Sequence, residues 1–349
     1  MSDLSETHKW FNARHTEAQS EHEQYEVEKA RGVACAYLLH YERDGLIPRG
    51  VEVPFTLPLI DENTGKDTGH TYSGIIDALV EDQEGNLWFV DHKTASKVDR
   101  SYWQELKTNA QITHYLLAAL QMHEGGLIDQ PVVGFLWDVI QKPGINPKDL
   151  TKKAVAELQC GDYCGIPFKP GYSGEERETP RMYGQRVYVD YTASPEKHFF
   201  RERRFRDAGQ LLRRLRNLNV HARGMAELKA DPKLGVENEG SCKQFNSLCD
   251  YHQICAGDDT DRTGYRPRPE RAEGDVRTVS GSLSPSRVQC YQSCTQKYVF
   301  RYVDKIEPQR PEYRASLHFG TLVHEAIENW LLGKIQRPIV FPNGEVLSD

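Results

Sequence analysis

The chain lacks the long apolar runs of a membrane protein. No hydrophobic stretch approaches the roughly 18 residues of a membrane span, and the N-terminal segment MSDLSETHKWFNARH contains no apolar region of a signal peptide. A basic excess is also lacking, because 44 Lys and Arg stand against 51 Asp and Glu, which gives a net charge of -7. We therefore expect a cytoplasmic protein without membrane association, in which nucleic-acid binding would require a local basic patch.

The chain also lacks internal repeats and long low-complexity tracts. Its 349 residues, 38% hydrophobic and 27% charged, suffice for one large or two ordinary globular domains. Eight cysteines occur without a secretion signal, so thiols or metal ligands are better interpretations than a disulfide framework.

Alternation of apolar and polar residues predicts strands over 51–60, 71–80 and 87–93, separated by turn-forming segments. This pattern is typical of an antiparallel meander. A strand over 131–141 follows a helical segment over 101–126, and strands combined with helices in this way favour an α/β, mixed α+β sheet core.

The remaining segments predict a core and a group of C-terminal helices that are separated by a linker. Residues 256–281 are polar, contain Gly and Pro and show no periodicity, so we expect a linker there. It would separate a core over 1–255 from helices over 282–349. The other predicted elements are a helix over 17–41, an insertion over 142–182, a strand over 185–192, a helical region over 194–225, and helices over 284–306 and 315–334.

Charged residues end the third predicted strand, in GNLWFVDHKTAS. Side chains alternate along a strand, so Asp91 and Lys93 share one face and His92 points to the other. A symmetric hairpin through 82–86 pairs Glu81 with Leu87 and places Asp77 opposite Asp91.

Two facing carboxylates destabilise a sheet unless a cation compensates them. Carboxylate oxygens suit Mg²⁺ or Mn²⁺, and such an ion can polarise a phosphodiester and activate water. The pattern therefore favours metal-assisted phosphodiester hydrolysis, with Lys93 orienting the water or stabilising negative charge. The alternative, a surface ion pair at a strand end, is the common interpretation of an isolated D-x-K.

Three segments in this order resemble the PD-(D/E)XK nucleases of the RecB-like branch. They are GIIDALV with Asp77, FVDHKTAS with Asp91 and Lys93, and QITHY with Gln111 and Tyr115. The resemblance implies a restriction-endonuclease-like core, metal binding by Asp77 and Asp91, and catalytic roles for Lys93, Gln111 and Tyr115.

A further segment, GTLVHEAIE near the C-terminus, resembles the helix with which this family supplies a histidine to the metal. The resemblance implies that His324 is a third metal ligand. Glu328 lies one helical turn further along the same face.

Three cysteines, Cys242, Cys249 and Cys255, fall in the short polar stretch SCKQFNSLCDYHQIC, and Cys294 lies in the helix that begins SPSR. In the iron-sulfur members of this branch, such a set holds a [4Fe-4S] cluster, which the resemblance implies here. Zinc accepts the same four thiolates and remains an alternative. The other cysteines are expected to be structural: Cys35, Cys160, Cys164 and Cys290.

The order of the segments differs from the family. There, the SPSR helix and the histidine helix precede the two catalytic strands, whereas here they follow them. Circular permutation explains this order if 282–349 fold back to complete 1–255. The rival explanation is a truncated second nuclease, but no second G-x-x-D or D-x-K follows His324.

The resemblance implies sequence-nonspecific DNA cleavage, exonucleolytic and on single-stranded or end-bearing DNA, in recombination, repair or phage DNA metabolism. A helicase or recombination protein would be a compatible partner. The alternatives are a catalytically inactive DNA-binding module or helicase-associated subunit, and a zinc-dependent regulatory protein. An arginine-rich stretch over 201–216 is either a phosphate track or a solvated face. The candidate phosphate contacts are Arg203, Arg204, Arg213 and Arg287.

Overall fold

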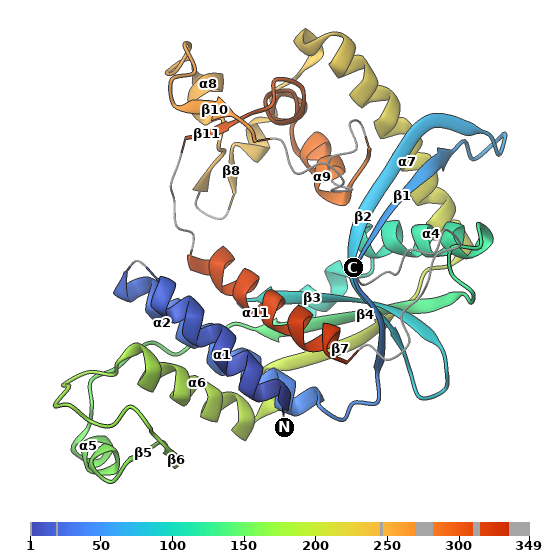
Figure 1. The fold of residues 1–349 in the computed structure, drawn as a ribbon. Helices are drawn as coiled ribbons and strands as arrows, with labels where there is room; N and C mark the ends of the chain where they lie inside the picture. The colour runs from blue at the N-terminus through green and yellow to red at the C-terminus, as the bar shows by residue number, and fades with distance from the viewer. Residues whose placement is uncertain (1, 19, 245–246, 270–281, 310–314, 335–349) are drawn as a thin grey trace.

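A five-stranded mixed sheet organises the chain in the computed structural model, which describes residues 2–18, 20–244, 247–269, 282–309 and 315–334. The strand order is β1-β2-β3-β4-β7 (Figure 1). Strands β3 and β4 run parallel, and the other neighbouring pairs run antiparallel. The strands are β1 (Ile47–Ile60), β2 (Asp67–Glu81), β3 (Leu87–Ala95), β4 (Val132–Gln141) and β7 (Phe199–Arg204).

The predicted meander is confirmed by β1, β2 and β3. Glu81 pairs with Leu87, as the symmetric hairpin requires, and Ala78 pairs with Val90 further along the ladder. The predicted fold class is also confirmed, because helices flank both faces of this mixed sheet. Coverage on both faces explains why β3 begins with a continuous apolar run instead of alternating.

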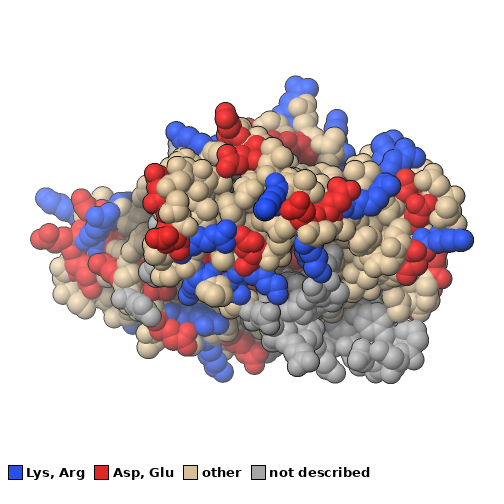
Figure 2. Space-filling view, turned by 90° about the horizontal axis from the view of Figure 1, so that it is seen from above, with Lys and Arg blue, Asp and Glu red and all other residues tan. Residues whose placement is uncertain are grey.

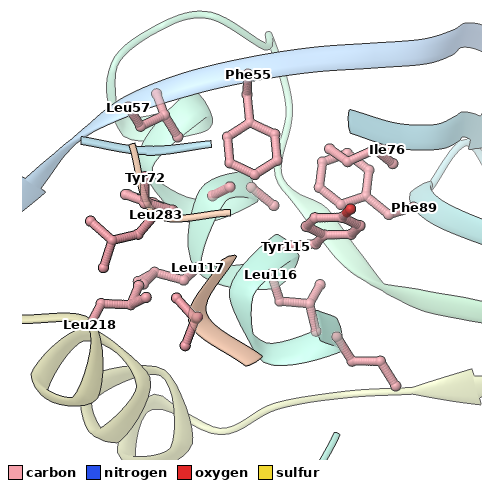
Figure 3. Close-up of a cluster of buried hydrophobic side chains, with 14 of the residues drawn as sticks. Phe55, Leu57, Tyr72, Ile76, Phe89, Tyr115, Leu116, Leu117, Leu218 and Leu283 are labelled. Atoms are coloured by element: carbon pink, nitrogen blue, oxygen red, sulfur yellow. The ribbon is translucent and has the colours of Figure 1, made fainter. Parts of the chain in front are cut away.

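One face of the sheet is covered by α4 (Ala110–Glu124), α7 (Ala208–Ala230) and α9 (Pro285–Ser293). The Tyr115 ring of α4 lies 5.8 Å from the Phe55 ring of β1, edge to face. Figure 3 shows both in the buried cluster that also contains Phe89, with Leu283 beside Tyr72. The backbone of Leu283 also forms hydrogen bonds with Thr71 O (2.9 Å) and Ser73 N (3.2 Å). The segment that leads into α9 is thereby attached to β2.

The other face is covered by helices from both ends and from the middle of the chain. Helix α11 packs against α2 and contacts β1 and β3 (Figure 1). Its buried residues Phe319, Val323 and Ile327 recur every four positions, so one side of the helix joins the core. The helices on this face are α1 (Ser2–Glu17), α2 (Glu21–Tyr41), α6 (Pro180–Ala193) and α11 (Ala315–Leu332).

The strand predicted over 185–192 is wrong, because these residues belong to helix α6. The Thr179 side chain accepts a hydrogen bond from Met182 N and caps the helix ahead of Pro180. Buried Val187 and Tyr191 lie four residues apart and pack in the core beside α2. Packing of apolar residues at helical spacing against α2 therefore outweighed the strand propensity of the β-branched and aromatic residues in this segment.

The helical region predicted over 194–225 is wrong in its first part, which contains strand β7. Phe199 and Phe200 pair with Ile140 and Val139 of β4. This segment is therefore extended, because it forms the edge strand of the sheet. Helix α7 begins only after Asp207, which forms a capping box with Gln210.

Two other expected segments are divided. The helix expected over 101–126 consists of α3 (Arg100–Glu105) and α4, separated where Asn109 caps α4. Within the expected linker 256–281, strand β10 (Tyr265–Pro267) pairs with β11 (Ile306–Pro308), and the Tyr265 ring stacks on Tyr251. Residues 270–281 lie outside the described residues. Further elements are α5 (Lys152–Gln159), β5 (Asp162–Tyr163), β6 (Ile166–Pro167), β8 (Lys243–Gln244), β9 (Ser247–Leu248), α8 (His252–Ala256), α10 (Thr295–Tyr298) and a π-helical turn (Val299–Val303).

Within the described ranges, none of the helices combines the length and the apolar character that crossing a bilayer requires.

Candidate active site

The two predicted carboxylates lie on neighbouring strands. Asp91 of β3 is fully buried, and its carboxylate contacts the ammonium group of Lys93 on the same face of the strand. Asp77 of β2 lines a cleft together with Lys93. Its Oδ2 accepts a hydrogen bond from the backbone N of His92 at 2.7 Å, which links the carboxylate to the strand that carries Asp91.

The electrostatic environment shifts the pKa values of these two carboxylates in opposite directions. Burial opposes ionisation of Asp77, but hydrogen bonds from His324 and His92 outweigh it and hold its pKa well below the usual range. Burial raises the pKa of Asp91 to about 6, with Lys93 opposing and Asp77 adding to the rise. Burial would lower the pKa of Lys93, yet the two carboxylates outweigh it and raise the pKa, so the lysine stays charged.

Gln111 and Tyr115 of α4 form hydrogen bonds with the two strands that carry the acids. Gln111 Nε2 donates to Asp91 Oδ1 at 2.8 Å, and Tyr115 OH donates to the carbonyl of Ile75 at 2.8 Å, two residues before Asp77. Gly74 makes room for this contact, because a Cβ there would lie 2.7 Å from the Tyr115 ring. The glycine of GIID is thus explained by the close approach of α4 to β2.

His324 reaches the site from α11, 247 residues away in the sequence. Its Nε2 lies 2.7 Å from Asp77 Oδ2, and this carboxylate outweighs burial to raise the pKa of the imidazole. Gly320, one turn earlier, allows α11 to approach β3, since a Cβ there would lie 3.1 Å from Thr94 Oγ1.

His92 is a site residue that sequence reasoning did not include. Its ring lies 6.1 Å from Tyr37 in the opposite core, as the strand alternation predicts. Nevertheless, ligand atoms of Asp77, His92 and His324 lie within 4.8 Å of one another. No sequence signal distinguished His92, because strand parity directs its side chain away from Asp91.

These residues fit a hard divalent cation. Apart from its ion pair with Lys93, the buried Oδ2 of Asp91 has no hydrogen-bond partner among the described residues. Two carboxylates with an imidazole suit Mg²⁺ or Mn²⁺. The ligand atoms that lie within 4.8 Å of one another belong to Asp77, His92 and His324, so Asp77 and His324 would hold the ion with His92 beside them. Asp91, the other predicted ligand, is not in this group.

The cleft of about 1170 Å³ extends from these residues to a cationic wall. On the exterior face drawn in Figure 2, by contrast, basic and acidic side chains are interspersed. Besides Lys93, the basic side chains that line the cleft, and that form this cationic wall, are Arg214, Arg268, Arg287, Arg301 and Lys305.

Of the four arginines expected to contact phosphates, Arg287 is among the residues that line this cleft. Arg203 lies over the Trp88 ring, and Arg204 forms an ion pair with Glu202, both on β7. Arg213 is exposed on α7. Neither β7 arginine nor Arg213 is among the cleft-lining residues.

The four cysteines expected to hold a cluster are neighbours. Cys249 N donates to Cys242 O at 2.8 Å. Cys294 is the N-cap of α10, and its thiol accepts a hydrogen bond from Lys297 N. Burial raises the pKa of Cys255 to about 11, and Glu237 and the other three cysteines each add to the rise. Cys35 is buried, as expected.

A family model described as the PD-(D/E)XK nuclease superfamily matches residues 2–256 and 282–339. No curated protein and no solved structure gave a significant match. Nucleases of this superfamily hydrolyse phosphodiester bonds and generally use Mg²⁺ or Mn²⁺. The matched residues cover most of the chain and include Asp77, Asp91, Lys93 and His324, so the chain belongs to the PD-(D/E)XK nuclease superfamily.

Proposed function

We propose that this protein is a metal-dependent deoxyribonuclease that degrades DNA from its ends without sequence preference. One observation carries the proposal: Asp77, Lys93 and the cationic wall line the same cleft, with His324 in contact with Asp77. A nucleic-acid backbone in this cleft would have phosphates between a candidate metal site and arginines.

Each site residue has a role that its contacts support. A bound Mg²⁺ or Mn²⁺ would polarise the phosphodiester and lower the pKa of a bound water. Lys93, charged and at the cleft surface, would stabilise negative charge that develops on the phosphate. Gln111 holds the Asp91 carboxylate in one orientation, and Tyr115 holds β2 near Asp77. We therefore assign Gln111 and Tyr115 as positioning residues.

The cysteine set supports a [4Fe-4S] cluster held by Cys242, Cys249, Cys255 and Cys294. The four thiols lie near enough to interact, since Cys242, Cys249 and Cys294 each raise the pKa of Cys255. The resemblance to the iron-sulfur members of the branch favours a [4Fe-4S] cluster, and a single zinc ion on the same thiolates is the alternative.

Circular permutation accounts for the order of the segments. The proposal is supported by two contacts between 282–334 and the sheet: the hydrogen bonds of Leu283 with β2, and the approach of His324 to Asp77. A truncated second nuclease would leave the first without its histidine helix.

The test is cleavage of end-labelled single- and double-stranded DNA in Mg²⁺ or Mn²⁺ by protein purified without oxygen. Asp91→Asn and Lys93→Ala should each reduce the rate at least ~100-fold, because the first removes a predicted metal ligand and the second removes the charge that would stabilise the reacting phosphate. Lys97→Ala is the matched control, since Lys97 is exposed and pairs with Asp99 outside the cleft lining.

Shortening from the ends would support exonuclease action, and internal nicks of circular DNA would contradict it. If the folded, cluster-loaded parent binds DNA but leaves it intact, the protein is a DNA-binding module and the proposed activity is wrong.

A further inference from the structure

A buried cation without an anionic partner lies beside the cleft. Arg214 of α7 is 5% exposed, and its side chain lines the cleft. Among the described residues, no carboxylate forms an ion pair with Arg214, and its buried Nε has no hydrogen-bond partner. An uncompensated buried charge is unfavourable, so such a charge indicates a ligand that neutralises it.

Among the described residues, the one hydrogen-bond partner of the Arg214 side chain is neutral. Its Nη2 lies 3.1 Å from His114 Nδ1, and His114 Nε2 lies 3.2 Å from the carbonyl of Ser73. Since a guanidinium only donates, His114 accepts at Nδ1 and carries its proton at Nε2. Burial, followed by the charge of Arg214, lowers the pKa of His114 to about 3, so the imidazole stays uncharged. The charge of Arg214 is therefore not balanced by His114.

The same part of the cleft contains the N-terminus of α9. Ser284 caps this helix by accepting from Arg287 N at 3.3 Å, and Ser284 and Arg287 both line the cleft. The N-terminus of a helix carries partial positive charge and presents N–H groups. Ser282, which precedes it, is 4% exposed and also lines the cleft. Its buried Oγ has no partner among the described residues.

These groups lie on adjoining segments. Ser73 N donates to Leu283 O, and the Ser73 carbonyl contacts His114, the partner of Arg214. The α7 cation and the α9 N-terminus are therefore joined through a single residue of β2.

We propose that Arg214, Ser282 and the N-terminus of α9 form a phosphate-binding site, which holds a phosphate of the DNA strand away from the phosphate that is cleaved. The inference rests on the proposed nuclease function and specifies how the substrate is held. A phosphate supplies the missing negative charge and accepts from the guanidinium, the hydroxyl and the helix N–H groups together. That phosphate is either at a 5′ end or within the strand.

The test measures binding without catalysis. A single-stranded oligonucleotide of about 12 nucleotides, labelled at its 3′ end, carries either a 5′-phosphate or a 5′-hydroxyl, and anisotropy is recorded in EDTA. Arg214→Gln should weaken binding at least ~10-fold, as expected for loss of a charge-assisted hydrogen bond. It should also reduce the slope of log affinity against log salt by about one.

Ser282→Ala keeps the result interpretable if Arg214→Gln folds poorly. Removing an unpartnered buried hydroxyl leaves the fold intact, and it should weaken binding about 3- to 10-fold. Arg216→Gln is the matched control, because Arg216 lies on the same helix but pairs with Glu62, is 57% exposed and is not among the cleft-lining residues.

Comparing the two probes shows whether the site binds a 5′-terminal phosphate or an internal phosphate. If the variants lose affinity only for the 5′-phosphate probe, the site holds a strand end, and an equal loss on both probes identifies an internal phosphate. Parent-like binding by folded Arg214→Gln and by Ser282→Ala overturns the site, while cleavage by the parent keeps the nuclease proposal intact. A parent that neither binds nor cleaves DNA overturns both.

Discussion

Replacing Arg201 should destabilise the protein, because it removes the cation that pairs with the buried carboxylate of Asp138 in strand β4. Asp138 of β4 is 0% exposed, and its Oδ2 lies 2.7 Å from Arg201 Nε and accepts from Tyr37 OH at 2.8 Å. Arg201→Met would leave the Asp138 charge with only a neutral donor. Breaking a buried pair from one side costs about 3–5 kcal/mol, so we expect a loss of this size in the free energy of unfolding.

Arg201→Met/Asp138→Asn separates the buried charge from the lost contacts. Asparagine can still accept from Tyr37, and no charge remains, so the double variant should be more stable than Arg201→Met by at least ~1.5 kcal/mol. Urea titrations of both variants and the parent, with unchanged m-values, measure these differences. Arg203→Met is the control on the same strand, because Arg203 is exposed and its guanidinium lies over the Trp88 ring face. Its loss should stay below ~1 kcal/mol.

A double variant that is no more stable than Arg201→Met would refute this role of the buried charge. In that case the arginine stabilises the sheet through packing over the Tyr41 ring, 3.9 Å from its guanidinium carbon, rather than through charge.

Three further predictions concern the site and its supports. His324→Ala should raise the Mn²⁺ concentration for half-maximal cleavage at least ~10-fold, and an unchanged metal titration would argue against ligation by His324. Cys294→Ser should remove the visible absorption and iron of the anaerobically purified protein, whereas exposed Cys160→Ser should retain both; persistence of the iron in Cys294→Ser would exclude that ligand. Gly74→Ala should destabilise the protein by about 1–3 kcal/mol in urea, because the new methyl would lie 2.7 Å from the Tyr115 ring and 2.8 Å from Phe55. Gly144→Ala, with nothing within 4 Å, is its control, and equal stability of the two variants would contradict the packing argument.

Local pattern was sufficient for the meander and its register. A short polar turn between two apolar segments leaves a single symmetric pairing, so counting from Glu81 and Leu87 gives the observed pairing of Ala78 with Val90, next to Asp77 and Asp91. Local pattern failed where two structures suited the same composition. The segment of α6 is rich in strand-forming residues, yet it is helical because its Val187 and Tyr191 face the core beside α2. The segment of β7 is rich in arginine, yet it is extended because its backbone pairs with the edge of β4 that β3 does not occupy.

The sequence by itself determined the residue types of the site, the strand face shared by Asp91 and Lys93, and the identity of the metal-ligand candidates. These depend on the period of a strand and on short motifs, which are local properties. Only the tertiary structure decided that His92 lies beside Asp77, because a carboxylate can reach a neighbouring strand regardless of parity. It also decided that Arg214, one of several arginines on α7, is buried at the cleft, while Arg216 pairs on the exterior. Burial and charge compensation depend on which distant segments meet, and no local pattern encodes that.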